Sequence, residues 1–326
     1  MSMKVKELVK AYTGVLLGKP DYWHPRFKVN EHLDKNVLGK YYLDMSSKAD
    51  YPGKFDVNDV PLLLLNNQSY HLPVTIAQFG LGNYDKYQTT KEDKYLKSVF
   101  DAANWFVNNC SIIDSSCAWY NYYENRLYSI KAPWVSAISQ GQGISVLVRA
   151  FRLSQKQQYL DIALKAAKIF EIPVDKGGVK TMVQGKYVFY EEYPTHAPSL
   201  VLNGFIFGLW GLYDLYLVTR EKAVLHSYEE GLKTLIHILP YYNFLGWSRY
   251  DLYNSHIPNV TNIFYHRLHI EQLKAMNKLI EKRIFLKYLT IWGKSEGNLS
   301  VIILSQAVKI LQKLSVRKLC ANVRYE

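Results

Sequence analysis

The chain has 326 residues, of which 48% are apolar and 21% are charged, a balance that argues against both a disordered protein and a membrane-protein composition. Its 40 basic and 28 acidic side chains give a formal net charge of +12, which favours a polyanionic partner. The basic residues are scattered, with no zinc-finger spacing, ribonucleoprotein signature or dense basic block, so nucleic acid is not expected. An acidic polysaccharide is the favoured partner, and the 27 tyrosines suit surfaces that bind sugar rings.

The first 70 residues are expected to form a small, irregular, partly β-structured segment. Short extended candidates, KYYLDM and KFDVND, lie there among Pro, Gly, Asp and Asn turn signals. The N-terminus, MSMKVKELVKAYTGVLLGK, predicts a short amphipathic helix, because lysines interrupt its apolar residues and no small-residue cleavage site follows. We therefore expect a cytoplasmic protein in which residues 1–70 pack on a catalytic domain at residues 71–326.

From residue 71 onward, apolar residues recur at helical spacing in consecutive pairs of segments. The predicted pairs are 73–87 with 92–109, 138–153 with 156–170, 199–218 with 221–239, and 264–280 with 299–314. Each unit is too one-sided to bury its own core, which is typical of a helical repeat. Closed into a ring, such hairpins make a mainly α protein, an incomplete α/α toroid. Its first helices would line the inside, and the loops that feed them would surround one concave opening.

Residues 199–218, SLVLNGFIFGLWGLYDLYLV, are apolar for long enough to suggest a membrane span. Asn203, Asp214 and three glycines interrupt the stretch. A helix that is apolar nearly all round is expected at the centre of a multi-helix core, so no membrane span is predicted.

The cysteines and histidines do not indicate a metal site. Cys110, Cys117 and Cys320 are an odd set without a CxxC motif, so reduced, buried thiols are expected instead of a disulfide framework. His266 and His269 lie three residues apart on a predicted helix, but a third ligand for that face is badly placed. The chain also has no GxGxxG or GxxxxGK[ST] motif, and we expect neither a metal nor a cofactor.

The stretch VFYEEYPTHAPSLVLNG, residues 188–204, crowds proton-exchanging groups before a helix. Glu192 and Tyr193 precede Pro194, where the backbone is pushed away from α geometry, and a helix is expected from about Ser199. Side chains on such a loop can point into a cavity. The ordinary alternative is that Glu191 and Glu192 are solvated loop charges.

Polar residues gather again between residues 247 and 273. That segment contains Arg249, Tyr250, Asp251, Tyr253, His256, Tyr265, His266, Arg267 and His269. Polar side chains also lie at the starts of the predicted inner helices, among them Gln78, Gln140 and Asn203, with Trp134 just before the second of these helices. We take these four as candidate substrate-binding residues. The alternative for Gln140 is that it ties helix starts together, because buried amides need partners.

Four motifs, QGQGISVLVRA, FYEEYPTHAPSLVLNGFIFGLWGLYDL, RYDLY and YHRLHIEQL, occur in an order that resembles the C-terminal domain of the D-glucuronyl C5-epimerases. Those enzymes convert glucuronate to iduronate in heparan-type chains. The upstream stretch PVTIAQFGL is also similar, so the resemblance covers about residues 71–281. It implies an α/α toroid, is compatible with a homodimer, and carries the family's proposed catalytic groups onto Glu192, Tyr193, Tyr250 and Tyr265.

The chain departs from that family at one informative position. The family motif YDLR has an arginine where this chain has Tyr253, so a carboxylate-binding cation is missing there. Arg249, His266 and Arg267 are the candidate replacements. The family's large β-rich N-terminal domain is matched by at most the first 70 residues.

The activity implied by the resemblance is C5-epimerisation of D-glucuronate to L-iduronate in a heparosan-like acidic polysaccharide. It needs two acid/base groups on opposite faces of the ring, with donors or positive charge on the carboxylate. We expect Tyr265 or Glu192 on one face and Tyr193 or Tyr250 on the other. A phenol acting as the base near neutrality needs a depressed pKa or an adjacent base. A uronate polysaccharide lyase and a catalytically silent acidic-glycan-binding protein are the alternatives.

Overall fold

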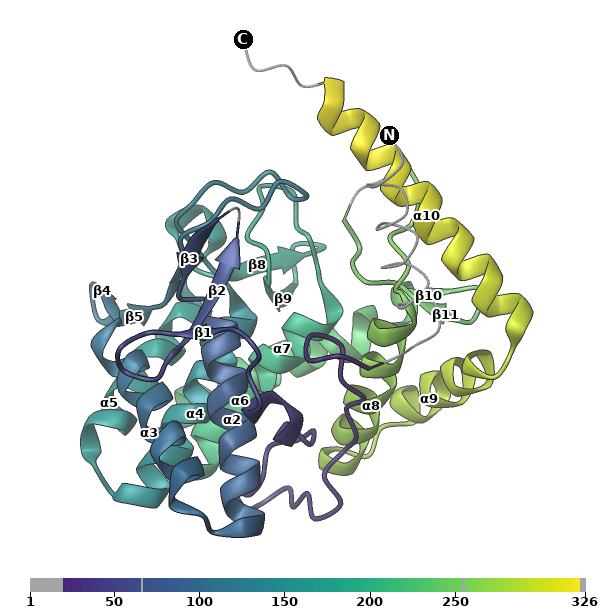
Figure 1. The fold of residues 1–326 in the computed structure, drawn as a ribbon. Coiled ribbons are helices and arrows are strands. Elements are labelled where there is room, and N and C mark those ends of the chain that lie inside the picture. Colours follow the sequence, from purple (N-terminus) through teal and green to yellow (C-terminus); the bar gives the residue numbers. More distant parts are fainter. Residues whose placement is uncertain (1–19, 66, 254–255, 323–326) are drawn as a thin grey trace.

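The structure, a computed structural model, describes residues 20–65, 67–253 and 256–322. The helix expected within residues 1–19 lies outside the described residues. Helices dominate the described chain, and they alternate between two layers (Figure 1). The inner helices are α2 (Pro73–Thr90), α4 (Ala137–Ser154), α6 (Leu202–Thr219) and α8 (Ile263–Leu279). The outer helices are α3 (Asp93–Asn108), α5 (Gln157–Ala167), α7 (Lys222–Ile238) and α9 (Arg283–Glu296).

Each inner helix packs on the next inner helix and on its own outer partner, so α2 contacts α4, α4 contacts α6 and α6 contacts α8. This alternation confirms the predicted α/α toroid. Helix α4 is buried along nearly its whole length, whereas α3 buries a single face with Val99, Ala103 and Phe106. The difference follows the sequence, since α3 is amphipathic and α4 is apolar on most sides.

Helix α6 lies at the centre of the core, as its apolar sequence predicted. It crosses α4 closely, because a Cβ atom at Gly141 would come 2.6 Å from the Phe207 carbonyl oxygen and 2.7 Å from the Gly208 Cα. Glycine at this position therefore sets the spacing of the two inner helices. Within the described part of the chain, no helix is long and apolar enough to cross a bilayer.

The last predicted helix pair is wrong. Helix α8 pairs with α9, which the sequence analysis did not predict, and the segment predicted at 299–314 is instead the start of a further helix, α10 (Leu299–Asn322). Helix α9 packs inward through Phe285, Tyr288 and Trp292, which are buried and recur at helical spacing. Helix α10 follows α9 and extends away from the helical ring (Figure 1).

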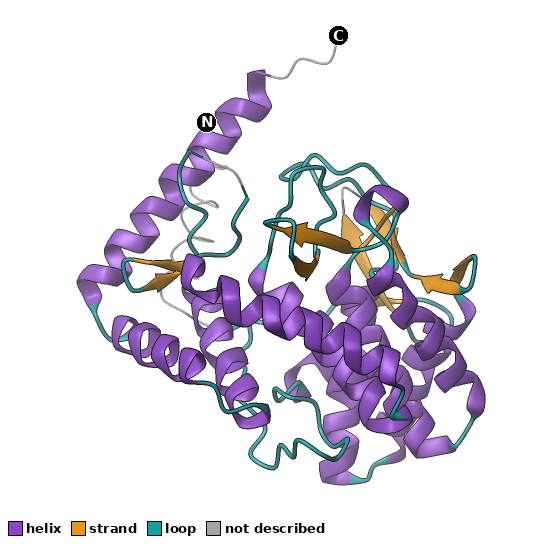
Figure 2. Cartoon of the chain, turned by 180° about the vertical axis from the view of Figure 1, so that it is seen from behind, coloured by secondary structure: helices purple, strands orange, loops and turns teal. Residues whose placement is uncertain are grey.

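Short antiparallel strands lie at one end of the helical ring (Figure 2). The N-terminal segment has the 3-10 helix η1 (Ser46–Ala49), followed by a three-stranded sheet of β1 (Lys54–Phe55), β2 (Pro61–Leu65) and β3 (Gln68–Tyr70). This matches the expected partly β character. Helix η1 packs on α2. The domain boundary at residue 70 stays a prediction.

Four β-hairpins lie where an outer helix leads to the next inner helix. They pair β4 (Ser111–Ile113) with β5 (Ser116–Ala118), β6 (Tyr120–Asn121) with β7 (Trp134–Val135), β8 (Lys180–Val183) with β9 (Tyr187–Tyr190), and β10 (Asn243–Phe244) with β11 (Trp247–Ser248). Three further 3-10 helices are η2 (Lys168–Glu171), η3 (Val174–Lys176) and η4 (Leu239–Tyr242). The hairpins therefore cluster around the starts of the inner helices.

The expectation of reduced cysteines is wrong for one pair. The β4–β5 hairpin brings Cys117 back beside Cys110, and the two form a disulfide with a Cα–Cα distance of 5.5 Å. Disulfides persist mainly in oxidising compartments. The cytoplasmic location, which was inferred from the N-terminal segment, stays a prediction.

Candidate functional site

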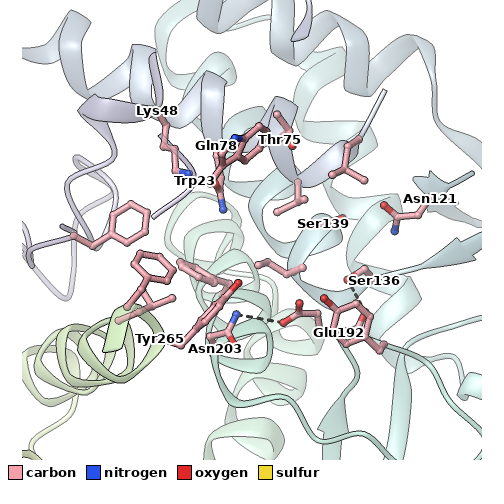
Figure 3. A pocket seen from close by; sticks show the side chains of 18 of the residues that line it. Trp23, Lys48, Thr75, Gln78, Asn121, Ser136, Ser139, Glu192, Asn203 and Tyr265 are labelled. Carbon is pink, nitrogen blue, oxygen red and sulfur yellow. Dashed lines mark hydrogen bonds between the residues drawn. The ribbon is translucent and has the colours of Figure 1, made fainter. Parts of the chain in front are cut away.

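A cavity of about 240 Å³ lies at the starts of the inner helices (Figure 3). Each of the four inner helices contributes its first turns to the wall, with Thr75 and Gln78 from α2, Ser139 from α4, Asn203 from α6 and Tyr265 from α8. The starts of the inner helices thus meet at a concave opening, as the repeat pattern predicts.

Glu192 is the one carboxylate in the described wall of this cavity. It follows β9, and the loop that carries it is tied to the start of α4, because Ser136 Oγ donates to the Glu192 carbonyl oxygen at 2.7 Å. The side chain is 6% exposed, so it is not a solvated loop charge. Asn203 Nδ2 donates to Glu192 Oε2 at 3.3 Å, as the dashed line in Figure 3 shows.

Burial raises the pKa of Glu192 to about 7, against the lowering effect of hydrogen bonds from Tyr193, Tyr250 and Asn203. A carboxyl group with this pKa is partly ionised at neutral pH. Its carboxylate form is also basic enough to remove a carbon-bound proton from a substrate held beside it. The side chain is therefore suited to work as a general base.

Glycine at position 204 makes room for this carboxylate. Gly204 is in the first turn of α6, and a Cβ atom there would overlap the Glu192 carboxylate and come 2.6 Å from the Glu192 Cβ. Any larger side chain would push Glu192 out of its position. The glycine of the VLNG motif thus leaves space for Glu192, which lies twelve residues before Gly204.

Glu191 has a different role from its neighbour. It is fully buried, and its carboxyl accepts hydrogen bonds from Ser199 Oγ at 2.5 Å and from the Leu200 backbone N–H at 3.0 Å. Burial raises its pKa to about 8. Glu191 is absent from the cavity wall among the described residues, so it holds the chain that leads into α6.

Three phenols surround Glu192. The Tyr250 hydroxyl donates to Glu192 Oε1 at 3.4 Å, and the rings of Tyr250 and Tyr265 meet edge to face with centroids 4.9 Å apart. Burial is the largest cause that raises the pKa of Tyr193, Tyr250 and Tyr265, and the charge of Glu192 raises each of them further. All three are neutral donors at pH 7. A phenol can act as a base if its pKa is depressed or if an adjacent base takes its proton. The raised pKa values contradict the first possibility, so the second is left.

Tyr193 is held by a stack that the sequence did not reveal. Its ring lies on that of Tyr128 with centroids 4.4 Å apart, and the Tyr128 hydroxyl donates to Asp251 Oδ2 at 2.6 Å. Asn259 Nδ2 donates to the same carboxylate oxygen at 2.6 Å. Asp251 therefore anchors the tyrosine stack, and no sequence pattern marked Tyr128 because it acts through a contact distant in the chain.

Three of the candidate substrate-binding residues, Gln78, Trp134 and Asn203, line the cavity. Gln78 Nε2 donates to Gln142 Oε1 at 3.4 Å. The Trp134 indole N–H donates to the Tyr123 carbonyl oxygen at 2.8 Å, which fixes the ring beside the cavity. Their roles in binding stay proposals.

Gln140 lies outside the described cavity wall and is fully buried. Its Oε1 accepts from the Trp119 backbone N–H at 2.9 Å, and its Nε2 donates to the Cys117 carbonyl oxygen at 2.9 Å. The amide is occupied by backbone partners in the core. The position therefore corrects its assignment to the substrate and agrees with the alternative that Gln140 ties elements together.

The three cations expected to replace the family arginine also lie outside the described wall. His266 is fully buried, stacks on Trp247 with centroids 3.6 Å apart, and has its pKa lowered to about 3 by burial, so it is neutral. Arg267 Nε donates to Glu296 Oε1 at 2.7 Å, an ion pair between α8 and α9. Arg249 is half-buried on a bridge to Val260. Core packing therefore holds His266, and an ion pair holds Arg267.

Lys48, on η1, is a charged wall residue that sequence reasoning missed. It is 3% exposed, and burial lowers the pKa of its ammonium to about 8, so it is mainly protonated at neutral pH. Its segment has no periodic pattern or motif that would mark it.

Among the described residues, no group of three His, Cys, Asp or Glu side chains is arranged to hold a metal ion.

Comparisons with known proteins show which family this chain resembles in sequence. Residues 113–294 match the family model described as the D-glucuronyl C5-epimerase C-terminus. The chain is 31% identical over 226 residues to the D-glucuronyl C5-epimerase of Caenorhabditis elegans, a match that covers 63% of this chain and 36% of that protein. It is 30% identical over 177 residues to "Uncharacterized protein MJ1128" of Methanocaldococcus jannaschii, with 53% and 56% covered. The chain thus spans less than two thirds of the length of either relative.

Two solved structures share the fold. The cellobiose 2-epimerase of Bacillus thermoamylovorans B4167 superposes with a TM-score of 0.53 at 11% identity, covering 89% of this chain and 87% of that one. The cellobiose 2-epimerase of Spirochaeta thermophila DSM 6192 gives 0.53 at 10% identity, with 90% and 85% covered. Identities this low establish the α/α barrel architecture alone.

Proposed function

Because the chain belongs to the D-glucuronyl C5-epimerase C-terminal domain family, we propose that it is an isomerase that converts D-glucuronate to L-iduronate residues in a heparosan-like acidic polysaccharide. The observation that carries the proposal is the buried Glu192, which shares one cavity with Tyr193 and Tyr265. The net charge of +12 favours a polymer whose repeating unit carries a carboxylate.

The reaction begins at the C5–H bond, next to the uronate carboxylate. Glu192 takes this proton, the C5–H electron pair moves into the carboxylate, and an enolate forms. Tyr265 then gives its phenolic proton to the opposite face of C5, and the electron pair returns to make the new C–H bond. The configuration at C5 is inverted, and no bond of the glycosidic chain is broken.

The assignment of base and acid follows from their environments. A pair of groups whose pKa values are pushed apart divides into a base and an acid. The pKa of Glu192 is about 7, whereas that of Tyr265 is raised above its ordinary value of 10 by burial. The sequence left Glu192 and Tyr265 as alternatives for one face. Since both line the cavity from different elements, we assign them to the two successive proton transfers.

Tyr250 completes the cycle as a proton relay. After one turnover Glu192 is protonated and Tyr265 is a phenolate, so one proton must pass between them. Tyr250 donates to Glu192 at 3.4 Å, and its ring meets that of Tyr265 edge to face, so Tyr250 contacts both groups. Passage of the proton through Tyr250 resets the site without a cofactor.

The cavity wall also offers surfaces for sugar rings. Trp23, Tyr123 and Trp134 supply flat apolar faces, and Gln78 and Asn121 supply amide groups for hydroxyls. A polysaccharide substrate is consistent with these surfaces. A homodimer and a cytoplasmic location stay predictions.

The test is to incubate the full chain with heparosan and to follow the product by proton NMR and ultraviolet absorbance. Iduronate signals without new absorbance support the proposal. An unsaturated uronate, with absorbance near the ultraviolet edge, would show that the C5 carbanion expels the C4 substituent and that the protein is a lyase. If the protein binds heparosan and forms neither product, it is a catalytically silent glycan-binding protein.

A further inference from the structure

Lys48 supplies the one positive charge in the described wall of the cavity. Its ammonium donates a hydrogen bond to the Tyr22 carbonyl oxygen at 2.8 Å and lies 4.6 Å from the centroid of the Tyr22 ring. The side chain is 3% exposed, so the charge has lost most of its contact with water. The N-terminal segment also places the rings of Trp23 and Phe27 near this ammonium, at 6.0 and 5.8 Å from their centroids.

No carboxylate in the described chain forms an ion pair with Lys48. The one acidic group that raises its pKa is Asp21, whose carboxylate is turned to the His24 backbone and ring. Burying an ammonium without a counter-charge costs free energy, which an anionic ligand would offset. The position of the ammonium in a cavity wall makes such a ligand accessible to it.

We infer that Lys48 binds the carboxylate of the hexuronate in the cavity, as the cation that stands in for the arginine missing at Tyr253. The inference rests on the proposed function. Figure 3 shows Lys48 and Gln78 on one side of the cavity and Glu192 on another, so a sugar lying between them meets the ammonium and the base at once. Its carboxylate is thereby held apart from the charge of Glu192.

The chemistry of the reaction gives this contact a second effect. When C5 loses its proton, the new negative charge moves onto the carboxylate oxygens, so a cation held there stabilises the enolate more than the substrate. Removing the charge of Lys48 should therefore reduce both the affinity and the turnover number. If Lys48 only supported the fold, a folded variant without its charge would keep the same affinity and the same turnover number.

The contact also explains how a chain with Tyr253 keeps the family's chemistry. Tyr253 lies outside the described cavity wall, with its ring 5.6 Å from that of Tyr128. The cation comes instead from η1, which packs on α2 beside the cavity. The N-terminal segment described from residue 20 onward is in this view part of the active site, because Lys48 determines the preference for a charged sugar.

The test compares two ligands on four proteins. The ligands are a heparosan hexasaccharide and the same hexasaccharide with each carboxylate reduced to the alcohol, and the proteins are the wild type, Lys48→Met, Lys48→Gln and the control Lys54→Met. Lys54→Met makes the same change in net charge as Lys48→Met. Lys54 is a suitable control because it is exposed and outside the described wall. The glutamine amide keeps a donor for the Tyr22 carbonyl oxygen, which separates loss of charge from loss of support.

Titration calorimetry should show that the wild type and Lys54→Met prefer the acidic hexasaccharide by about 10- to 100-fold, the range of a hydrogen bond between charged groups. In Lys48→Met and Lys48→Gln the preference should fall to about threefold or less, with iduronate formation lowered at least tenfold at saturating substrate. If folded Lys48→Gln keeps the full preference for the acidic hexasaccharide while the wild type forms iduronate, the role of Lys48 is overturned and the proposed function is not. A wild type that forms no iduronate would overturn the proposed function first.

Discussion

The Tyr250 hydroxyl donates a hydrogen bond to Glu192 Oε1 across 58 positions of sequence, at a distance of 3.4 Å. The same ring meets Tyr265 edge to face, so one phenol contacts both the proposed base and the proposed acid. The loop after β9 supplies the glutamate, the turn after β11 supplies Tyr250, and the first turn of α8 supplies Tyr265. The ring of helical hairpins is what brings these three together.

The activity should depend on pH through Glu192. Its pKa is about 7 in the folded protein, and it must be ionised to accept the C5 proton. We expect kcat/KM for iduronate formation to rise as the pH increases through about 7 and to fall again as the pH passes about 8, where Lys48 loses its proton. The measurement is the initial rate at low substrate between about pH 5.5 and 8. A flat profile over this range would exclude Glu192 as the base.

Replacing Glu192 by glutamine should abolish activity and raise stability. The folded-state pKa of about 7 exceeds the ordinary value of 4.5, so this group favours the folded state below pH 4.5 and loses that contribution as the pH rises through 7. Glutamine does not titrate and avoids the loss. At about pH 8 we expect Glu192→Gln to raise the free energy of unfolding by about 1–3 kcal/mol, with little gain at about pH 5.

Chemical denaturation at the two pH values measures this difference. The control is Glu171→Gln, because Glu171 is exposed. Equal stability of wild type and Glu192→Gln at both pH values would show that burial of the carboxyl carries no such cost.

Tyr265→Phe should stop iduronate formation without harming the fold, because only a hydroxyl is removed. We expect a loss of at least about 100-fold in turnover, the usual contribution of a positioned acid, and an affinity for heparosan within about threefold of wild type. Glu192 can still exchange the C5 proton of glucuronate with solvent in this variant. Tyr241→Phe is the matched control, since Tyr241 is 52% exposed. Unchanged iduronate formation would remove Tyr265 from the mechanism.

Gly204→Ala should damage the site by moving Glu192. A Cβ atom there would come 2.6 Å from the Glu192 Cβ, so the carboxylate must shift, at a cost of about 1–3 kcal/mol in stability. We expect at least a tenfold loss of kcat. Gly293→Ala in α9 is the control, because a Cβ atom there meets nothing within 4 Å. That variant should be stabilised by about 0.5–1 kcal/mol, as alanine favours a helix. Full activity of Gly204→Ala would contradict the packing argument.

The helical fold was predictable because its signal is local. An outer helix such as α3 carries apolar residues on one side, and α6 is apolar nearly all round, so each records its own burial in its sequence. Helix α9 could have been found in the same way, since Phe285, Tyr288 and Trp292 recur at helical spacing. The disulfide could not, because pairing of Cys110 with Cys117 depends on the turn between β4 and β5.

The site was predictable where a motif records it and not where packing alone creates it. Glu192 and Tyr265 lie in recognisable motifs, and the structure brings them to one cavity. Gln140 looked the same in sequence as Gln78, but the core partners that occupy its amide come from distant segments. Lys48 has no motif at all. Its place in the wall follows from the way η1 packs on α2, which a single sequence does not reveal.

The central claim is that Glu192 removes the C5 proton of a glucuronate residue, and proton NMR of heparosan in heavy water tests it most directly. The full chain should replace C5 hydrogen with deuterium in both glucuronate and iduronate without shortening the polymer, and Glu192→Gln should leave it in place. If the wild-type protein binds heparosan and every C5 proton is retained, the account is wrong.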